Sequence, residues 1–529
     1  MEFELIIKGG TVVDGAKSKP ARQDIGIRDG IIEAIGTIEG AAGRVIDATG
    51  RVVCPGFIDT HSHSDLVLFS DPVLQPKTFQ GITTEVIGQD GMGVAPLSGK
   101  YIKAWKKSMS SLAGNCDVDW NWCSVSEYLK EVDKQALGPN IAFLAPHSNI
   151  RMCAMGLDNR KPSADELRCM EKLLEQCIEE GAYGMSTGMI YPPCCYAGTD
   201  EFVALGKVLA KTGTAFVTHQ RSEADAILES CDEILSIGRQ SGCRIHFSHL
   251  KVCGKKNWSK LDPMLCKFDE AENEGVCLSF DQYPYVAGST MMSVIFPPWA
   301  HDGGVPRLLE RLHNPELRKR MIFDIEHGIE GWDNFVDFAG LDGIFVASVK
   351  TQANKSAAGK SLIELGAERG KPPLEAVMDL IVEEDNAVGL VDFYGTEEHL
   401  VKIMQRPEHN VGSDGVIGDK PHPRLYGTYP RILGKYVREG VLDLPDAVHK
   451  MTGKAAEVLG LKGRGIIRKG YAADIVVFDA GSVEDTATYT DPKQFPHGIE
   501  HVIVNGRVLI EHGKSNPVKA GRVLKFSGR

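Results

Sequence analysis

Two histidines separated by one serine, His61 and His63, are the residues of this sequence best suited to metal chemistry. They follow the segment 55–59 (PGFID), which we expect to form a turn and a short apolar strand. Side chains two residues apart on a strand share a face, and neutral imidazole is a common ligand of zinc-type ions. A His-x-His pair alone is often accidental, but at a strand end it predicts two ligands of a divalent cation.

Four more residues, three of them at or just after the ends of apolar runs, carry groups that bind metals or protons. Asp90 lies in 88–91 (GQDG) after the apolar 83–87, and Asp414 lies in the glycine-flanked 411–415 (VGSDG). His219 and His249 each end an apolar run, about thirty residues apart, as one βα unit would space them.

Taken singly, each of these four has a simpler explanation. His219 could be a packed histidine, and His246 competes with His249, although His246 is one residue out of phase and should face a packed or supporting position. Asp90 and Asp414 could merely form turns. Four histidines and two carboxylates in this order nevertheless predict a hydrolytic site for one or two metal ions.

The part of the sequence that must position these residues alternates between short apolar runs typical of strands and amphipathic stretches typical of helices. Residues 58–455 read as parallel βα units, for example with a helix capped by Ser163 and Glu166. We therefore predict an α/β protein with a (β/α)₈ TIM-like barrel, whose site lies at the carboxyl ends of the strands. Residues of about 285–345 fit this rhythm less well and are predicted to form an insertion beside the site.

The two ends of the chain read as short strands. We expect residues 1–57 and 456–529 to form one small split β-domain, with a turn at Gly9-Gly10 and hairpins at Asp29-Gly30 and Asn505-Gly506.

Bulk properties exclude several classes of function. The net charge is −12 and no basic run is present, which argues against nucleic acid or an anionic membrane as partner. We find no signal peptide and no apolar run long enough for a membrane span. The thirteen cysteines are odd in number and scattered, so we expect reduced thiols and a cytoplasmic location. The sequence leaves open whether the protein forms a homo-oligomer.

The chain resembles the amidohydrolase superfamily, and within it the N-acyl-D-amino-acid deacylase (D-aminoacylase) family, over essentially its whole length. The resemblance rests on the terminal strands and on six motifs: 55–63 (PGFIDTHSH), 184–188 (GMSTG), 248–251 (SHLK), 283–289 (YPYVAGS), 412–415 (GSDG) and 421–428 (PHPRLYGT). It implies a metal-bearing barrel that hydrolyses N-acyl-D-amino acids, most often with zinc, one or two ions. It also implies that Asp414 orients water and carries its proton to the leaving amine.

One position departs from the family pattern. The family has a Gly-Asn-Cys-Gly segment whose cysteine binds zinc, whereas this chain has Asp90 in GQDG. A carboxylate can bind or bridge divalent metals but is a harder ligand than a thiolate. Asp90 is therefore either a replacement ligand beside His61, His63, His219 and His249, or a turn residue.

The resemblance also implies a set of substrate-binding residues. Lys251, Tyr283, Ser289 and Arg424 lie on motifs similar to the family's substrate-binding segments and would hold the substrate carboxylate. The segment 296–299 (FPPW) could line a side-chain pocket, and without a second cation there we favour neutral or apolar D-residues.

Two other functions stay open at this point. A cyclic-amide hydrolase of the dihydropyrimidinase type should carry a bridging lysine mid-barrel, but the matching stretch 144–149 (LAPHSN) has none. A non-catalytic binding protein on the same fold would have lost the metal ligands, and these are present together.

Overall fold

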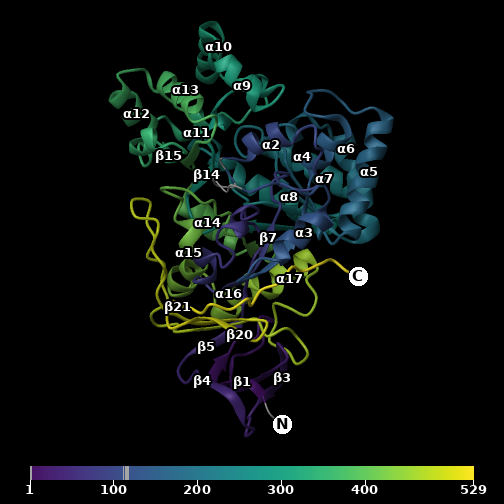
Figure 1. The fold of residues 1–529 in the computed structure, drawn as a ribbon, viewed down its shortest axis with the longest axis vertical. Helices are drawn as coiled ribbons and strands as arrows, with labels where there is room; N and C mark the ends of the chain where they lie inside the picture. Colours follow the sequence, from purple (N-terminus) through teal and green to yellow (C-terminus); the bar gives the residue numbers. More distant parts are fainter. Residues whose placement is uncertain (1–2, 111, 113–117, 529) are drawn as a thin grey trace.

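A nine-stranded sheet at one end of the molecule is built from strands of both chain ends. The structure is a computed structural model that describes residues 3–110, 112 and 118–528. Strands coloured purple and yellow lie side by side at the bottom of Figure 1. The order of the sheet, with β4 (Ala42–Asp47) pairing with β1, is β21 (Lys514–Ser515), β20 (Arg507–Glu511), β19 (Ile499–Val504), β18 (Ile475–Phe478), β5 (Val52–Pro55), β1 (Phe3–Val12), β2 (Ala21–Arg28), β3 (Ile31–Gly36).

Both predicted hairpins are confirmed in this sheet. β2 and β3 pair antiparallel around Asp29-Gly30, and β19 and β20 pair around Asn505-Gly506. The predicted turn at Gly9-Gly10 is wrong: β1 is a single strand whose register against β2 shifts between Ile7 and Gly10. Gly9 has a φ of +73°, so the glycine pair accommodates a bulge instead of reversing the chain.

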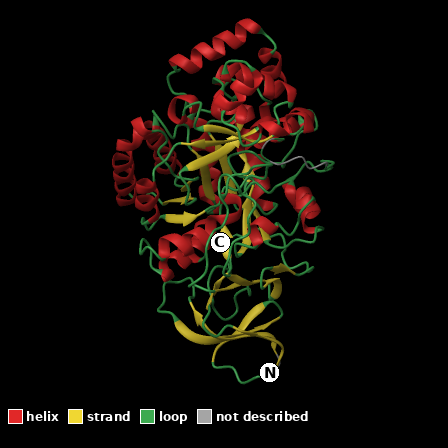
Figure 2. Cartoon of the chain, turned by 90° about the vertical axis from the view of Figure 1, so that its left-hand side faces the viewer, coloured by secondary structure: helices red, strands yellow, loops and turns green. Residues whose placement is uncertain are grey.

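The middle of the chain is a TIM-barrel-like α/β structure with parallel strands and helices outside them (Figure 2). The parallel ladders fall into two sheets. One consists of β6 (Phe57–Asp59), β7 (Ile82–Ile87) and β8 (Asn140–Phe143). The other has the order β17 (His409–Val411), β13 (Leu278–Gln282), β12 (Arg244–Phe247), β11 (Ala215–His219), β10 (Gly184–Gly188), β9 (Ala145–Pro146). No single closed eight-stranded ladder is traced within the described residues.

Amphipathic helices cover the parallel strands because one face of each is apolar. α5 begins at the predicted Ser163–Glu166 capping box. Phe247 on β12 and Phe280 on β13 pack against Phe268 of α8 in the main core. The helices of this part are α1 (Gln75–Thr78), α2 (Ile102–Met109), α3 (Val125–Asp133), α4 (His147–Met155), α5 (Ala164–Glu179), α6 (Thr199–Thr212), α7 (Ile227–Ser241), α8 (Leu261–Asn273), α14 (Glu397–Met404), α15 (Arg424–Arg431), α16 (Leu444–Met451) and α17 (Gly453–Leu459).

An antiparallel sheet interrupts the parallel strands between β13 and β17. Its order is β14 (Ala287–Met291), β16 (Gly389–Phe393) and β15 (Ile344–Ser348). This sheet extends to Phe393. The insertion is therefore longer than the sequence analysis predicts, which ends it at about residue 345. It carries its own core, and its helices lie at the top of Figure 1. These are α9 (Val305–Leu312), α10 (Pro315–His327), α11 (Phe335–Ala339), α12 (Leu362–Arg369) and α13 (Pro373–Glu383).

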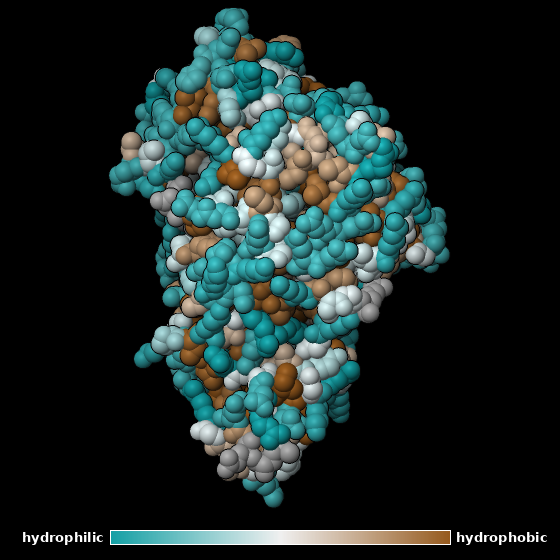
Figure 3. Space-filling view, turned by 45° about the vertical axis from the view of Figure 1, so that its right-hand side comes forward, coloured by the Kyte–Doolittle hydropathy of each residue, from teal (hydrophilic) through white to brown (hydrophobic). Residues whose placement is uncertain are grey.

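The visible surface in Figure 3 is mostly hydrophilic, with apolar side chains in small separate patches. Among the described residues, no helix combines the length and hydropathy needed to span a bilayer.

Candidate metal centre and substrate cavity

The predicted histidine pair follows β6 and lies directly against Asp414. A parallel bridge joins Ser62 to Gly415, and the Asp414 N–H donates to the His61 carbonyl at 2.9 Å. The loop after β17 is thereby pinned beside the loop after β6. The two imidazoles are buried, with ring centroids 5.3 Å apart.

A first group of potential ligands consists of His61, His63, Asp90 and Asp414, all buried. Asp90 Oδ2 lies 3.4 Å from His61 Nε2 and 3.5 Å from His63 Nε2. Asp414 Oδ1 lies 3.1 Å from His63 Nε2 and 3.7 Å from His61 Nε2. A tetrahedral ion with bonds of roughly 2.0–2.2 Å separates its ligands by about 3.3–3.6 Å. The four atoms are therefore spaced as ligands of one ion would be.

A second group shares Asp90 with the first and adds His219 and His249. His249 Nε2 lies 3.7 Å from Asp90 Oδ1 and 3.0 Å from His219 Nδ1. Asp90 thus directs Oδ2 to the first group and Oδ1 to the second. A carboxylate in this arrangement is suited to bridging two ions.

Three of these residues hold an unfavourable backbone conformation. The φ angles of Asp90, His249 and Asp414 are +54°, +35° and +47°. For residues other than glycine, such angles cost on the order of 1 kcal/mol or more and persist only where neighbouring structure enforces them. The Asp281 carboxylate enforces one of them by accepting the His249 N–H at 2.8 Å.

Several buried polar atoms of the centre lack protein partners. Both ring nitrogens of His61, Oδ1 of Asp90 and Nε2 of His219 make no hydrogen bond in the described structure. Buried polar atoms without a partner are costly. Such atoms, converging from imidazoles and carboxylates, fit a bound cation.

Burial and charge act on these groups in opposite directions. Burial lowers the pKa of His61, but Asp90, Asp414 and Asp281 outweigh it and raise that pKa above its ordinary value. Burial lowers the pKa of His219 to about 4, so this imidazole is neutral at pH 7 and free to act as a ligand. Burial raises the pKa of Asp414, but Arg424 and His61 outweigh it, and the carboxylate stays ionised.

A network of buried charged residues contacts the residues of the metal centre and their sequence neighbours. Lys77 is buried and its Nζ donates to Asp59 Oδ2 at 2.7 Å and to Ser413 Oγ at 2.6 Å, next to Asp414. His246 approaches Asp281 Oδ2 at 2.9 Å through Nε2, and the same oxygen lies 3.6 Å from His61 Nδ1. His246 therefore supports the centre and stands outside it.

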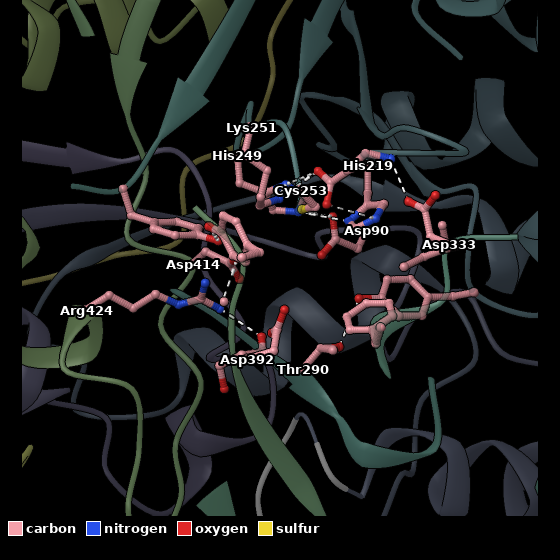
Figure 4. A pocket seen from close by; sticks show the side chains of 18 of the residues that line it. Asp90, His219, His249, Lys251, Cys253, Thr290, Asp333, Asp392, Asp414 and Arg424 are labelled. Atoms are coloured by element: carbon pink, nitrogen blue, oxygen red, sulfur yellow. Dashed lines mark hydrogen bonds and ion pairs between the residues drawn. The ribbon is translucent and has the colours of Figure 1, made fainter. Parts of the chain in front are cut away.

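Arg424 dominates the other side of the same cavity (Figure 4). Its guanidinium is 0% exposed, lies 3.0 Å from Asp414 Oδ2 and stacks 4.4 Å from the Tyr283 ring. Nη2 also donates to the Ser289 carbonyl at 2.9 Å. Nε and Nη1 have no partner. A buried guanidinium with two free donors is suited to a carboxylate.

The remaining predicted substrate residues line this cavity with different partners. Lys251 Nζ donates to Glu223 Oε1 at 2.6 Å, and Tyr283 and Tyr394 share a hydroxyl contact of 2.7 Å. The Ser289 hydroxyl donates to the Leu390 carbonyl at 2.7 Å and so points along the sheet. The structure thus brings every predicted site residue to one place. All of them line the cavity except His61, which is fully buried behind its lining.

Sequence reasoning missed four acids in or beside this site, one of which is Asp333 in the segment before α11. Glu223 lies in the loop after β11, and Asp392 on β16 lines the cavity while 3% exposed. Asp281 lies near the end of β13, within 2.9 Å of His246 Nε2 and 3.6 Å of His61 Nδ1. Its position at the carboxyl end of an apolar run was a usable signal, whereas neither Glu223 nor Asp392 follows a pattern.

Comparison with known proteins places the chain in a family. A model described as amidohydrolase family matches residues 44–336 and 346–510. The N-acyl-D-glutamate deacylase of Alcaligenes xylosoxydans xylosoxydans is 36% identical, over 99% of this chain and 97% of the relative. A D-aminoacylase of the same organism is 33% identical, over 99% and 97%.

A solved structure is similar over the whole length. The N-acyl-D-glutamate deacylase of Bordetella bronchiseptica, complexed with zinc and a phosphonate that mimics the tetrahedral intermediate, superposes with a TM-score of 0.84. It is 32% identical and the match covers 99% of this chain and 100% of the other. The chain therefore belongs to the amidohydrolase superfamily and, within it, to the N-acyl-D-amino-acid deacylase family.

Proposed function

We propose that this protein is a metal-dependent hydrolase that cleaves the amide bond of N-acyl-D-amino acids to give a carboxylate and a free D-amino acid. The observation that carries the proposal is one cavity that unites a histidine–carboxylate cluster with a buried arginine whose two free donors fit a carboxylate. Such a cavity can hold the amide and the α-carboxylate of one substrate at the same time.

The donor set supports zinc or a similar divalent ion. We assign His61, His63, Asp90, His219 and His249 as ligands because their side chains converge at ligand spacing, and His61, Asp90 and His219 carry buried atoms without a partner. When bound, such an ion polarises the amide carbonyl and makes water acidic enough to supply hydroxide near neutral pH. Asp90 stands where the family has a cysteine and belongs to both groups of potential ligands, so it would help to hold the ion or ions in either group.

Asp414 is the proton carrier in this proposal. Its Oδ1 faces the cluster and its Oδ2 faces Arg424, so one carboxylate touches both the water side and the substrate side. It accepts the proton of the attacking water and returns it to the amine nitrogen as the C–N bond breaks. A positioned acid–base of this kind contributes about 10²–10⁴-fold.

Arg424, Lys251, Tyr283 and Ser289 bind the α-carboxylate in this proposal, Ser289 by orienting Arg424 through its carbonyl. The cavity is lined by five acids and, besides histidines, by two cations among the described residues, Lys251 and Arg424. An acidic substrate side chain would find no free cation. We therefore propose neutral or apolar D-residues as substrates, in contrast to the D-glutamate named for the relative.

The wider architecture is part of the proposal. β8 and β9 are separated only by Leu144, and the Ser62–Gly415 bridge links the other edges, which supports one closed (β/α)₈ barrel over 58–455. The nine-stranded sheet would be a separate domain of 1–57 and 456–529. The described cysteines are free, which supports a reducing, cytoplasmic setting.

A cyclic-amide hydrolase is the alternative, but no lysine stands at the end of β8 or β9, where Ala145, Pro146 and buried His147 lie. Purified protein, assayed for bound metal and for turnover, separates the functions. Hydrolysis of N-acetyl-D-amino acids without hydantoin turnover supports the deacylase. The deacylase proposal would be overturned if the protein hydrolysed hydantoins alone. It would also be overturned if the protein bound no divalent metal and hydrolysed none of these substrates.

A further inference from the structure

Three potential metal ligands lie together on the nine-stranded sheet, outside the metal centre described above. Glu500 and His501 belong to β19, and His512 lies in the turn between β20 and β21, in the yellow part of Figure 1. One side-chain nitrogen or oxygen of each lies within 4.8 Å of those of the other two. None of the three lines the cavity around Arg424. The proposed hydrolysis therefore makes no use of this cluster.

A β-bulge brings the carboxylate into the cluster. In the ladder between β19 and β18, His501 pairs with Val477 and Ile499 pairs with Phe478, so Glu500 has no partner residue there. Neighbouring side chains of a regular strand point to opposite faces, and the extra residue of a bulge breaks this alternation. The bulge thus allows the consecutive side chains of Glu500 and His501 to approach one another.

The turn after β20 supplies the third group. β20 pairs antiparallel with β19, with Glu511 opposite His501, and the His512 N–H donates to the Glu500 carbonyl at 2.7 Å. The rings of His501 and His512 pack edge to face, with centroids 4.6 Å apart. Backbone pairing therefore holds the second imidazole beside the first, although His512 itself is exposed.

His501 is the buried member of the cluster. It is 4% exposed, and its Nδ1 makes no hydrogen bond in the described structure. A buried polar atom without a partner is costly. Arg51 Nε donates to Glu500 Oε1 at 2.6 Å and so anchors the carboxylate at this place. A buried imidazole that lacks a partner, beside a second imidazole and an anchored carboxylate, fits a bound cation.

We propose that Glu500, His501 and His512 form a separate divalent-metal site, which binds Zn²⁺ or a cation of the same class and ties the turn after β20 to β19. Imidazole nitrogen and carboxylate oxygen are ordinary zinc ligands. The ligands of a tetrahedral zinc ion lie about 3.3–3.6 Å apart. The exposed His512 side chain can rotate to close the remaining distance.

The expected affinity is moderate. Three protein ligands at an exposed turn leave part of the coordination to water, so the site binds less tightly than a closed site of four ligands. We expect a dissociation constant for Zn²⁺ on the order of micromolar. The site does not depend on the proposed hydrolytic activity, and its tests are valid whatever the enzyme hydrolyses.

Zinc titration of the whole enzyme tests the site. Zinc-replete protein, passed through gel filtration to remove weakly held metal, is titrated with Zn²⁺ by calorimetry. His512→Asn removes the imidazole and keeps a residue that tolerates the φ of +45°, and Glu500→Gln removes the anionic ligand. We expect wild type to bind one ion more than His512→Asn, and Glu500→Gln to bind that ion at least ten-fold more weakly. Equal stoichiometry and affinity in wild type and both variants would overturn the proposal.

A second histidine variant is the matched control. His313 is exposed and belongs to none of the groups of potential ligands found among the described residues. His313→Asn should retain the additional ion, and thermal unfolding without metal should show that all three variants fold. If His313→Asn lost an ion as well, the binding would belong to surface histidines in general and the proposed site would be wrong.

Hydrogen–deuterium exchange locates the ion without reference to stoichiometry. An ion that binds the closed turn and not the opened one slows local opening by a factor of 1 + [Zn²⁺]/Kd, about ten-fold at a concentration of ten times Kd. Added Zn²⁺ should therefore slow exchange within residues 499–516 of the zinc-replete wild type and leave this segment of His512→Asn unchanged. Slowing confined to the loops that carry His61, Asp90, His219 and His249, or equal in both proteins, would contradict the proposed site.

Discussion

Replacement of Asp90 tests the one position where this chain departs from its family. Asp90 is common to the two groups of potential ligands at this site, with its two oxygens 3.4–3.7 Å from His61, His63 and His249. Asp90→Asn is the preferred change, because asparagine tolerates the φ of +54° that alanine does not. The variant keeps the size and turn preference of the side chain and removes its charge.

The magnitude follows from what Asp90 contacts. Loss of a partner that merely orients a ligand costs about 10–100-fold in metal affinity. Removal of an anionic ligand shared by two groups should exceed this, so we expect the metal dissociation constant to rise at least about 100-fold, or about 2.7 kcal/mol. Asp90→Cys should retain zinc and part of the activity, because thiolate and carboxylate both bind zinc at that corner.

Metal competition titrations on the purified variants measure the effect. Circular dichroism and thermal unfolding of Asp90→Asn without metal provide the control for folding. An unchanged dissociation constant and stoichiometry in Asp90→Asn would refute the reasoning and leave Asp90 as a turn residue.

Three further predictions concern the other acids and Arg424. Asp414→Asn should retain most bound metal and lower kcat at least about 10²-fold; near-wild-type turnover of metal-replete variant excludes the proton role. Arg424→Met should lower kcat/KM for N-acyl-D-amino acids by about 2–4 kcal/mol and abolish the preference for the acid over its amide; equal wild-type rates on acid and amide contradict this. Burial raises the pKa of Asp392 to about 7, above its ordinary value, so its ionisation destabilises the folded state as pH rises through 7. Asp392→Asn should therefore raise the free energy of unfolding at pH 9, by on the order of 4 kcal/mol at most, and by little at pH 4; an equal gain at both pH values would exclude this ionisation as the cause.

Local patterns predicted the elements whose determinants are local. The Ser163 capping box, the Asp29-Gly30 and Asn505-Gly506 hairpins and the strand that ends at His219 all depend on residues a few positions apart. The turn at Gly9-Gly10 was mistaken because a glycine pair also permits a bulge, and the ladder to β2 decides between the two.

The rest of the site depends on contacts distant in sequence. Glu223 matters because Lys251 reaches it, and Asp392 because the inserted strand β16 places it opposite Arg424 and Lys251. Ser289 carries a hydroxyl that the family motif suggests for substrate, yet strand pairing directs it to the Leu390 carbonyl. None of these contacts has a sequence signature.

The central claim is most directly tested by kcat/KM for the two enantiomers of one neutral N-acetyl amino acid, before and after removal of bound metal. We predict hydrolysis of the D-enantiomer at least 100-fold faster than of the L-enantiomer, lost on metal removal and restored by adding zinc. Hydrolysis that persists without metal, or no hydrolysis of the D-enantiomer by zinc-replete enzyme, would contradict it.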